Sequence, residues 1–308
     1  MKSKDVALRN LEQHEDVFAD IVQGFVSQKG FQIRPGELSE RSETVCLGMD
    51  KKGIRSQSRD VVKYWASDGK DKAIIGLENQ STIDRYMPLR VFAYSGGDYK
   101  YQVARLCEAK DAQNNPEPMP VMTIVVYVGM ETKWERPRQL VDSVTIDDTL
   151  KPYITNNTLN IINVAWLEPS EIRRFKSDFR HVADMCRQLR LYGSYKPKKD
   201  IVLTHPYEFA QVWYAFTQDP RIAEFFSEDD KQEVKMCEFL DSIEKRGEKR
   251  GEKRGEKRGR EEGEKTERDK TKLVVNYLNK VGKLDKLPDV LENRRSFSRY
   301  LALALAGG

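Results

Sequence analysis

The sequence contains few of the residues that build zinc or thiol sites. Among 308 residues there are three histidines and four cysteines. The cysteines lack the close spacing of metal ligands, which favours reduced thiols and a cytoplasmic location over a disulfide or zinc framework. They are Cys46, Cys107, Cys186 and Cys237. The three histidines do not indicate a zinc site either, and we expect His14 and His181 to lie on helix surfaces.

Long apolar runs and phosphate-binding glycine motifs are also missing. No apolar stretch reaches the length of a membrane-spanning helix, and the first five residues lack an apolar signal core, so we expect a soluble protein without a membrane partner. No G-x-G-x-x-G or Walker motif occurs. The segment 244–272 holds 13 Lys/Arg and nine Asp/Glu, while the rest of the chain is neutral. Overall charge therefore gives no argument for nucleic acid.

The stretch from Asp60 to Gln80 has the pattern of a β-hairpin that carries acidic residues. Two apolar runs flank the turn Ser67-Asp-Gly-Lys-Asp71, a hairpin signal. Alternate residues of a strand share a face, so Glu78 and Gln80 point the same way, and the hairpin brings Asp60 near them. Two carboxylates on one face suit a hard cation such as Mg²⁺.

Two interpretations of these acids remain open from spacing alone. Carboxylates at strand ends are usually solvated. Glu78, however, follows the apolar run Ala73–Leu77, and a buried carboxylate requires a partner or a metal.

A basic stretch lies directly before the hairpin. Its four cations could contact a phosphate backbone, or they could belong to a solvated loop. They are Lys51, Lys52, Arg55 and Arg59.

The remaining periodicity predicts a mixed α/β fold. Helices are expected over 8–30, over 85–109 with a break or kink at Gly96-Gly97, over 168–191, and from 208 towards 240. Strands are expected over 44–47, 121–128 (a buried central strand) and 159–166. Asp16 and Asp20 share one side of the first helix, where a solvated face is the simplest interpretation.

Several blocks of the sequence, taken in order, resemble one known family. They are Phe18-Ala-Asp20-Ile, Arg34-Pro-Gly-Glu37-Leu, Arg59-Asp60-Val-Val-Lys, Ile75-Gly-Leu-Glu78-Asn-Gln80, Tyr86-Met-Pro88-Leu-Arg90, Pro120-Val-Met-Thr-Ile-Val-Val-Tyr127 and Trp134-Glu-Arg-Pro137. They look like blocks of the recombination-promoting nuclease or "putative transposase" family of the PD-(D/E)XK nuclease superfamily. The resemblance covers roughly residues 10–240.

The resemblance implies a restriction-endonuclease-like fold, with a mixed β-sheet core flanked by helices, and a DNA endonuclease that uses Mg²⁺, or Mn²⁺ in its place. Asp60, Glu78 and Gln80 would form the catalytic core. Asp60 and Glu78 would ligate the metal, and Asp20 would be an accessory carboxylate. Gln80 stands where the superfamily has lysine, and a neutral amide can only orient water. A catalytically inactive DNA-binding or assembly protein, or an RNA-cleaving effector, therefore remains an alternative.

The C-terminal part carries a four-residue Gly-Glu-Lys-Arg repeat that begins at Gly247. Without an apolar seam it is no ordinary coiled coil. A marginal solvated helix, a disordered linker, a basic arm on DNA and a Gly-striped helix for homo-oligomer formation all fit the pattern. We expect a nuclease-like domain over 1–240, the repeat over 241–265 and a small helical appendix over 266–308.

Overall fold

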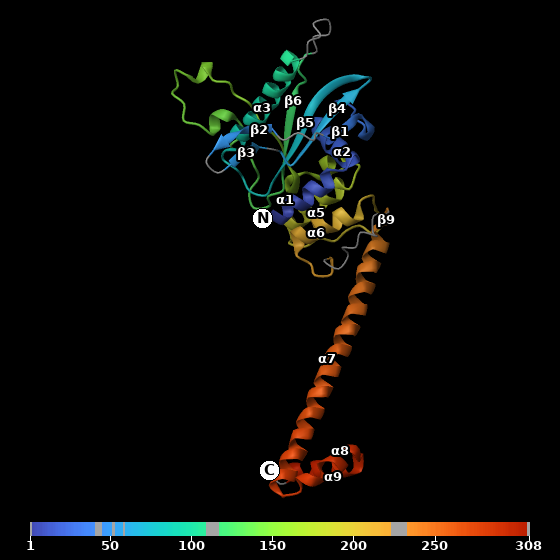
Figure 1. The fold of residues 1–308 in the computed structure, drawn as a ribbon. Helices are drawn as coiled ribbons and strands as arrows, with labels where there is room; N and C mark the ends of the chain where they lie inside the picture. The colour runs from blue at the N-terminus through green and yellow to red at the C-terminus, as the bar shows by residue number, and fades with distance from the viewer. Residues whose placement is uncertain are drawn as a thin grey trace. The chain divides into compact units, whose positions relative to one another are not determined.

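The computed structural model describes residues 2–40, 45–50, 53–57, 59–108, 117–222 and 233–306. It divides into two compact units, residues 1–243 and 244–308. The N-terminal unit is built on a five-stranded mixed sheet with flanking helices (Figure 1), which confirms the predicted fold class. In the order β1-β4-β5-β6-β7, its strands are β1 (Leu38–Glu40), β4 (Val61–Ser67), β5 (Lys70–Gln80), β6 (Val121–Tyr127) and β7 (Asn160–Asn163).

The predicted hairpin is present as β4 and β5, which pair antiparallel. Its turn has positive φ at both central residues, 55° at Asp68 and 70° at Gly69. Two positive φ angles match the twist of antiparallel strands, and Asp-Gly is a preferred sequence for such a turn. β5 then pairs parallel with β6, and β6 with β7. The predicted central strand 121–128 therefore lies inside the sheet.

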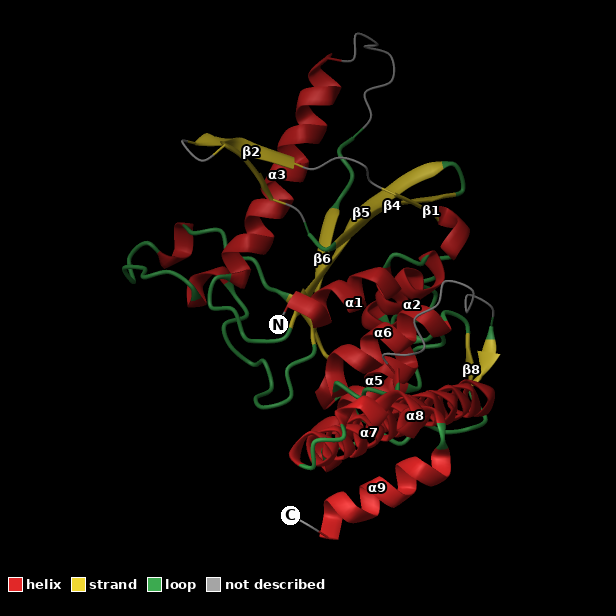
Figure 2. Ribbon diagram, turned by 60° about the horizontal axis from the view of Figure 1, so that its bottom comes forward, coloured by secondary structure: helices red, strands yellow, loops and turns green. Residues whose placement is uncertain are grey.

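Helices cover both faces of this sheet (Figure 2). Four of them pack on one face, and the long helix α3 packs on the other. The first group consists of α1 (Lys2–Glu12), α2 (Glu15–Val26), α5 (Phe179–Tyr192) and α6 (Pro206–Thr217), whereas α3 spans Met87–Glu108. Two further strand pairs, β2 (Val45–Asp50) with β3 (Gly53–Gln57) and β8 (Val202–Leu203) with β9 (Val234–Lys235), complete the described strands.

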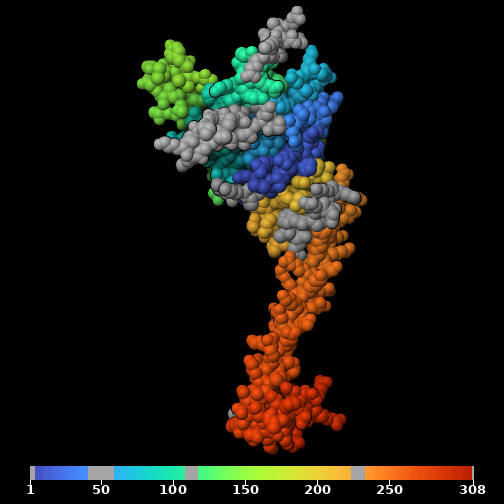
Figure 3. Space-filling view, in the orientation of Figure 1, coloured from blue at the N-terminus to red at the C-terminus, as the bar shows by residue number. Residues whose placement is uncertain are grey.

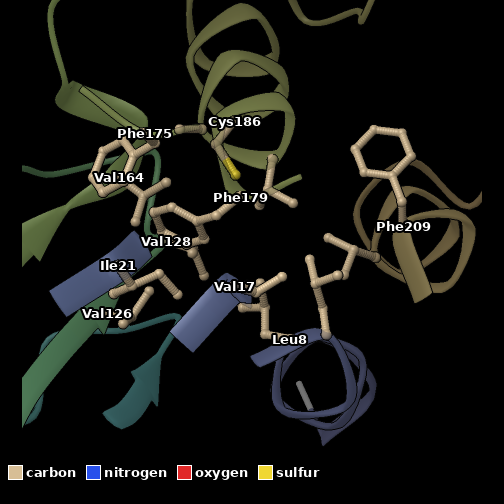
Figure 4. Close-up of a cluster of buried hydrophobic side chains, with 14 of the residues drawn as sticks. Leu8, Val17, Ile21, Val126, Val128, Val164, Phe175, Phe179, Cys186 and Phe209 are labelled. Carbon is tan, nitrogen blue, oxygen red and sulfur yellow. The ribbon is translucent and has the colours of Figure 1, made fainter. Parts of the chain in front are cut away.

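The side chains of β6 alternate between the two helical layers. Val126 enters the larger core with Ile21 and Phe179 (Figure 4). Val125 and Tyr127 belong to the smaller core beneath α3. Because successive strand residues point to opposite faces, a strand buried on both sides is apolar throughout.

The helices differ from their predicted bounds at three places. The expected helix 8–30 is two helices, which meet at Gln13-His14. The expected helix 168–191 is also divided, into the short α4 (Pro169–Ile172) and α5, because the turn between them buries Phe175 in the core. Of the break or kink predicted at Gly96-Gly97, the break is wrong, since α3 continues through both glycines.

Two helical glycines provide a test of packing against backbone propensity. Gly96 is exposed and an added Cβ would meet nothing within 4 Å, whereas at Gly24 it would lie 2.4 Å from Phe175 Cε1. Gly96→Ala should stabilise the fold by about 1 kcal/mol through helix propensity. Gly24→Ala should destabilise it by roughly 1–3 kcal/mol through overpacking. Urea unfolding of both variants checks the pair, and two changes of the same sign would contradict this packing.

The C-terminal unit consists of helices joined by short turns. Helix α7 (Met236–Lys280) begins in the first unit and continues through the Gly-Glu-Lys-Arg repeat, where exposed pairs such as Arg258 with Glu262 support it. The predicted helical appendix is present as α8 (Leu287–Glu292) and α9 (Arg294–Ala306). Val274, Leu278 and Val290 form its small core. None of the described helices combines the length and apolarity needed to cross a bilayer.

Candidate metal-binding and catalytic site

The register of the hairpin places Asp60 beside Glu78. Val61 pairs with Leu77, so the residue before the first strand lies next to the residue after Leu77. Asp60 Oδ2 accepts a hydrogen bond of 2.8 Å from the backbone N–H of Asn79. The two acids that the sequence proposed as metal ligands are therefore brought together.

Glu78 and Gln80 point to the face covered by α3, as their spacing predicts. Gln80 Nε2 donates to Glu78 Oε1 over 3.4 Å. The same oxygen accepts a hydrogen bond from Arg90 and one of 3.4 Å from the Tyr94 hydroxyl, both on α3. Glu78 is only 3% exposed. The three donors hold one of its two carboxylate oxygens, Oε1, in place.

A further acid, Glu12, approaches from the opposite face of the sheet. It is the last residue of α1 and is fully buried. Its Oε2 accepts a hydrogen bond of 2.6 Å from Asn79 Nδ2. Asp5 lies seven residues earlier, which is the same side of the helix. Sequence reasoning missed Glu12, although acids seven apart on the first helix were a detectable signal.

Buried oxygens without a hydrogen-bond partner mark this cluster. They are Glu12 Oε1, Glu78 Oε2, Asn79 Oδ1 and Asp5 Oδ1. A buried acceptor without a donor is costly. In both Glu12 and Glu78, one carboxylate oxygen accepts a hydrogen bond from a neighbouring side chain and the other accepts none. This arrangement fits a cation that the carboxylates would ligate.

The raised pKa values of these acids also indicate that the cluster lacks positive charge. Burial raises the pKa of Glu12 to about 8 against the hydrogen bond from Asn79, and the charge of Asp60 adds to the rise. Burial and Asp60 raise the pKa of Glu78 to about 7, although Arg90 opposes them. The pKa of Asp60 is also raised by burial, against Asn79, Arg9 and Arg90. A divalent cation would stabilise all three ionised forms.

The donor set indicates which cation fits. Carboxylate and amide oxygens are hard ligands that suit Mg²⁺ or Mn²⁺. The acids do not form a closed cage. Among the described residues, the group of three ligand atoms that lie within 4.8 Å of one another is formed by His14, His205 and Glu208, not by these acids. Mg²⁺ commonly keeps several waters and takes one or two protein carboxylates, so Asp60 and Glu78 suffice.

The raised pKa of Glu12 predicts how stability varies with pH in the absence of metal. The folded-state pKa of about 8 exceeds the ordinary 4.5, so the folded protein retains a proton that the unfolded chain releases. The contribution of Glu12 to stability is then fully present below about pH 4.5 and is lost as pH rises towards 8. At about 1.4 kcal/mol per pKa unit, Glu12 accounts for several kcal/mol. In EDTA, Glu12→Gln should flatten the fall of the melting temperature between pH 5 and 8. Parallel curves for the two proteins would contradict this role.

The structure does not place Asp20 in this cluster. Asp20 Oδ2 accepts hydrogen bonds from the backbone N–H groups of Lys176 and Ser177 and from the Ser177 hydroxyl, at 2.7–2.8 Å. It holds the turn before α5. Asp20 is therefore not one of the acids gathered around Asp60, whereas Glu12 is.

Arg59 is not available to nucleic acid, contrary to the sequence-based prediction. It is 6% exposed. Its guanidinium pairs with the fully buried Asp98 and donates to Thr123 Oγ1 over 3.0 Å. Gly76 provides the space, since a Cβ there would lie 2.3 Å from Arg59 Cδ. Of the other predicted phosphate contacts, Lys51 and Lys52 lie outside the described residues, and Arg55 lies in β3, where the structure describes the backbone alone.

The fold and the site together define a mixed α/β protein with a buried cluster of acids at the end of a central hairpin. Residues 65–193 match the model of a family described as "Putative transposase, YhgA-like". The match confirms the resemblance to the putative transposase family, and it includes Glu78 and Gln80 but begins after Asp60. Comparison with curated proteins and with solved structures finds no match for the chain.

Proposed function

We propose that the N-terminal unit is a Mg²⁺-dependent DNA endonuclease that acts in recombination or in the movement of mobile elements. The observation that carries the proposal is the pair of buried, unbonded oxygens on Glu12 and Glu78, two acids whose pKa values are raised by burial and by the charge of Asp60. The resemblance to the PD-(D/E)XK superfamily and the family match support hydrolysis of a phosphodiester in DNA.

The residues divide into ligands and positioning groups. Asp60 and Glu78 would hold the cation, and Glu12 would act as the accessory acid. Asn79 orients two of these acids, because its backbone N–H donates to Asp60 and its side chain donates to Glu12. When bound, the metal would polarise the scissile phosphate and acidify a bound water.

Gln80 and Arg90 together take the place of the superfamily's lysine. Gln80 lies on the same face as Glu78, where its amide can orient a water by hydrogen bonds. Arg90 supplies the positive charge: it pairs with Glu78 and Asp84, and 36% of its side chain is exposed. A guanidinium at this position can stabilise charge that develops on a phosphate.

A pocket beyond the end of β5 gives the substrate a place next to these groups. Ser81 and Thr82, which follow Gln80 directly, line it together with Lys4, Thr132, the acidic Glu131 and apolar residues such as Ile83 and Met130. Hydroxyl groups and a lysine are common phosphate contacts that carry no sequence information. We therefore expect cleavage with little sequence preference from this pocket.

A cleavage assay with the purified full-length protein tests the proposal. Supercoiled plasmid DNA and a single-stranded RNA are each incubated with Mg²⁺, with Mn²⁺ and with EDTA. The expected result is nicking of the plasmid with either metal and none with EDTA. A shifted DNA band with no cut product under any condition would overturn the endonuclease and indicate a DNA-binding or assembly protein. Cleavage of RNA alone would indicate an RNA-cleaving effector.

A further inference from the structure

A pocket in the helical layer of the N-terminal unit is lined mainly by positive side chains. It lies where the end of α4, one side of α5 and the loop before β8 come together. Its volume of about 360 Å³ is within the range of small-molecule sites. The cations that line it are Arg173, Arg180, Arg187 and Lys198.

Helix α5 contributes one side of this pocket because its polar residues recur at helical spacing. Arg180, Asp184 and Arg187 are four and three positions apart, so they share one side of the helix. The opposite side, with Val182 and Cys186, is buried in the core. The charged side chains are therefore held on a helix that packing fixes in place.

The loop that completes the pocket is tied to the start of α7. Met236 N–H donates to Ile201 O over 2.8 Å. Cys237 N–H donates to Lys199 O over 3.2 Å. Lys198 directly precedes these anchored residues, so the pocket is formed before a ligand arrives.

The positive charge of the pocket is only partly neutralised. In the ranges that the structure describes, Arg173, Arg180 and Lys198 form no ion pair, and Arg187 meets Glu168 at 3.6 Å. Two carboxylates also line the pocket, so its four cations exceed its acids by two.

Two buried groups show the effect of this excess. Arg187 Nε is buried and has no hydrogen-bond acceptor in the described part of the chain, and an unpaired buried donor is costly. His181, predicted to lie on a helix surface, lines the pocket. Burial lowers the pKa of His181 to about 4, and the charge of Arg180 adds to the fall. An anion in the pocket would give Arg187 an acceptor and offset the mutual repulsion of the cations.

The lining indicates which anion fits. Guanidinium groups bind phosphate oxygens through paired hydrogen bonds, and a lysine adds a point charge. Pro169, Ile172 and Ile201 form the apolar part of the lining. The volume leaves room for a sugar or a base on this apolar part, beside a phosphate group on the cations.

We propose that this pocket binds the phosphate groups of a ligand of nucleotide size, with Arg180, Arg187 and Lys198 as the phosphate contacts. The site shares no residue with the acid cluster at Asp60 and requires no divalent metal. Free nucleotides and the backbone of DNA both present this chemistry. Only the second source rests on the proposed endonuclease, for which the pocket would then anchor the substrate.

Calorimetric titration of the full-length protein in EDTA tests the site. The titrants are ATP, inorganic phosphate and a short duplex DNA, at about 0.15 M salt, where exposed charges are largely screened. We expect ATP or the duplex to bind more tightly than inorganic phosphate. Without divalent metal no cleavage is measured, so an inactive nuclease would leave this result unaffected. Binding of neither ATP nor the duplex would overturn the site.

Matched variants locate the binding. Arg180→Gln and Arg187→Gln should each weaken it at least about tenfold, since each removes a charge-assisted contact to phosphate. Lys29→Gln removes an exposed cation after α2 and should have less than about a twofold effect. Asp200→Asn removes a carboxylate from the pocket and should tighten binding, which serves if an arginine variant fails to fold. Unchanged affinity in the folded arginine variants, or weaker binding by Asp200→Asn, would contradict the proposal.

Histidine NMR locates the ligand without a substitution in the pocket's charged groups. His181 lines the pocket, whereas His14 and His205 do not. The rings of those two stack, with centroids 3.7 Å apart. His14 follows α1 and His205 precedes α6, and these helices lie side by side at the surface of the unit (Figure 3, dark blue and gold). The titrant that binds should move the ring signal of His181, assigned with His181→Gln, and leave the other two in place. Movement of the other two signals without that of His181 would overturn the site.

Discussion

Asp60→Asn and Glu78→Gln should each lower Mg²⁺-dependent plasmid nicking at least about 100-fold while the protein stays folded. Each substitution keeps the size of the side chain and removes the negative charge that binds the cation. The loss of a direct ligand removes stabilisation of the transition state, and about 2.7 kcal/mol corresponds to 100-fold in rate. The initial rate of nicking at saturating Mg²⁺ measures the effect, and far-UV circular dichroism verifies the fold.

The exposed Asp148 provides the control for these variants. Its side chain is 89% exposed and pairs with Lys151 on the surface, so Asp148→Asn should nick at the wild-type rate. The nicking rate of Glu12→Gln should lie between that of Asp148→Asn and those of the two ligand variants, with about a tenfold loss. An accessory acid contributes charge without being an indispensable ligand. Full activity in either Asp60→Asn or Glu78→Gln would remove the basis for the proposed catalytic site.

Asp98→Ala should destabilise the fold by about 3–5 kcal/mol, the largest effect on stability that we expect from one polar residue. The substitution leaves the guanidinium of Arg59 buried without its carboxylate, and an uncompensated buried charge is costly. Asp98 is fully buried on α3, and Arg59 directly precedes Asp60. Chemical unfolding of the purified variant measures the change.

Two further proteins separate the buried charge from a general loss of contacts. Asp148→Ala removes an exposed pair with Lys151, whose side chain is 59% exposed, and should cost less than about 1 kcal/mol. The double variant Arg59→Met with Asp98→Leu should recover part of the stability lost in Asp98→Ala, because both charges of the pair are then removed. If Asp98→Ala costs no more than the surface control, the pair does not anchor this strand.

The hairpin and its two acids could be predicted from sequence because their determinants are local. The Asp-Gly turn sets the register, and the alternation of a strand puts Glu78 and Gln80 on one face. Glu12 could not be placed so easily, since its role depends on α1 packing against the end of β5. Nothing in its immediate neighbours distinguishes it from Asp20, whose Oδ2 accepts hydrogen bonds from Ser177 instead.

Arg59 and the histidines show the same limit more sharply. Arg59 stands among basic residues in the sequence, yet Gly76 and Asp98 bury it, and these lie 17 and 39 positions away. His14 and His205 lie too far apart for any spacing rule to connect them. Contacts made by packing between distant segments decide these environments, and a single sequence records them only indirectly.

The lengths of the strands have a consequence for self-association. The sheet is bordered by β1, with three residues, and by β7, with four, whereas β5 at its centre has eleven. A short border strand presents little unpaired backbone for another chain to extend, which is a common protection against edge-to-edge aggregation. Copies of this chain would therefore gain little from joining their sheets into a continuous one, and a concentrated solution should resist fibre formation through this core.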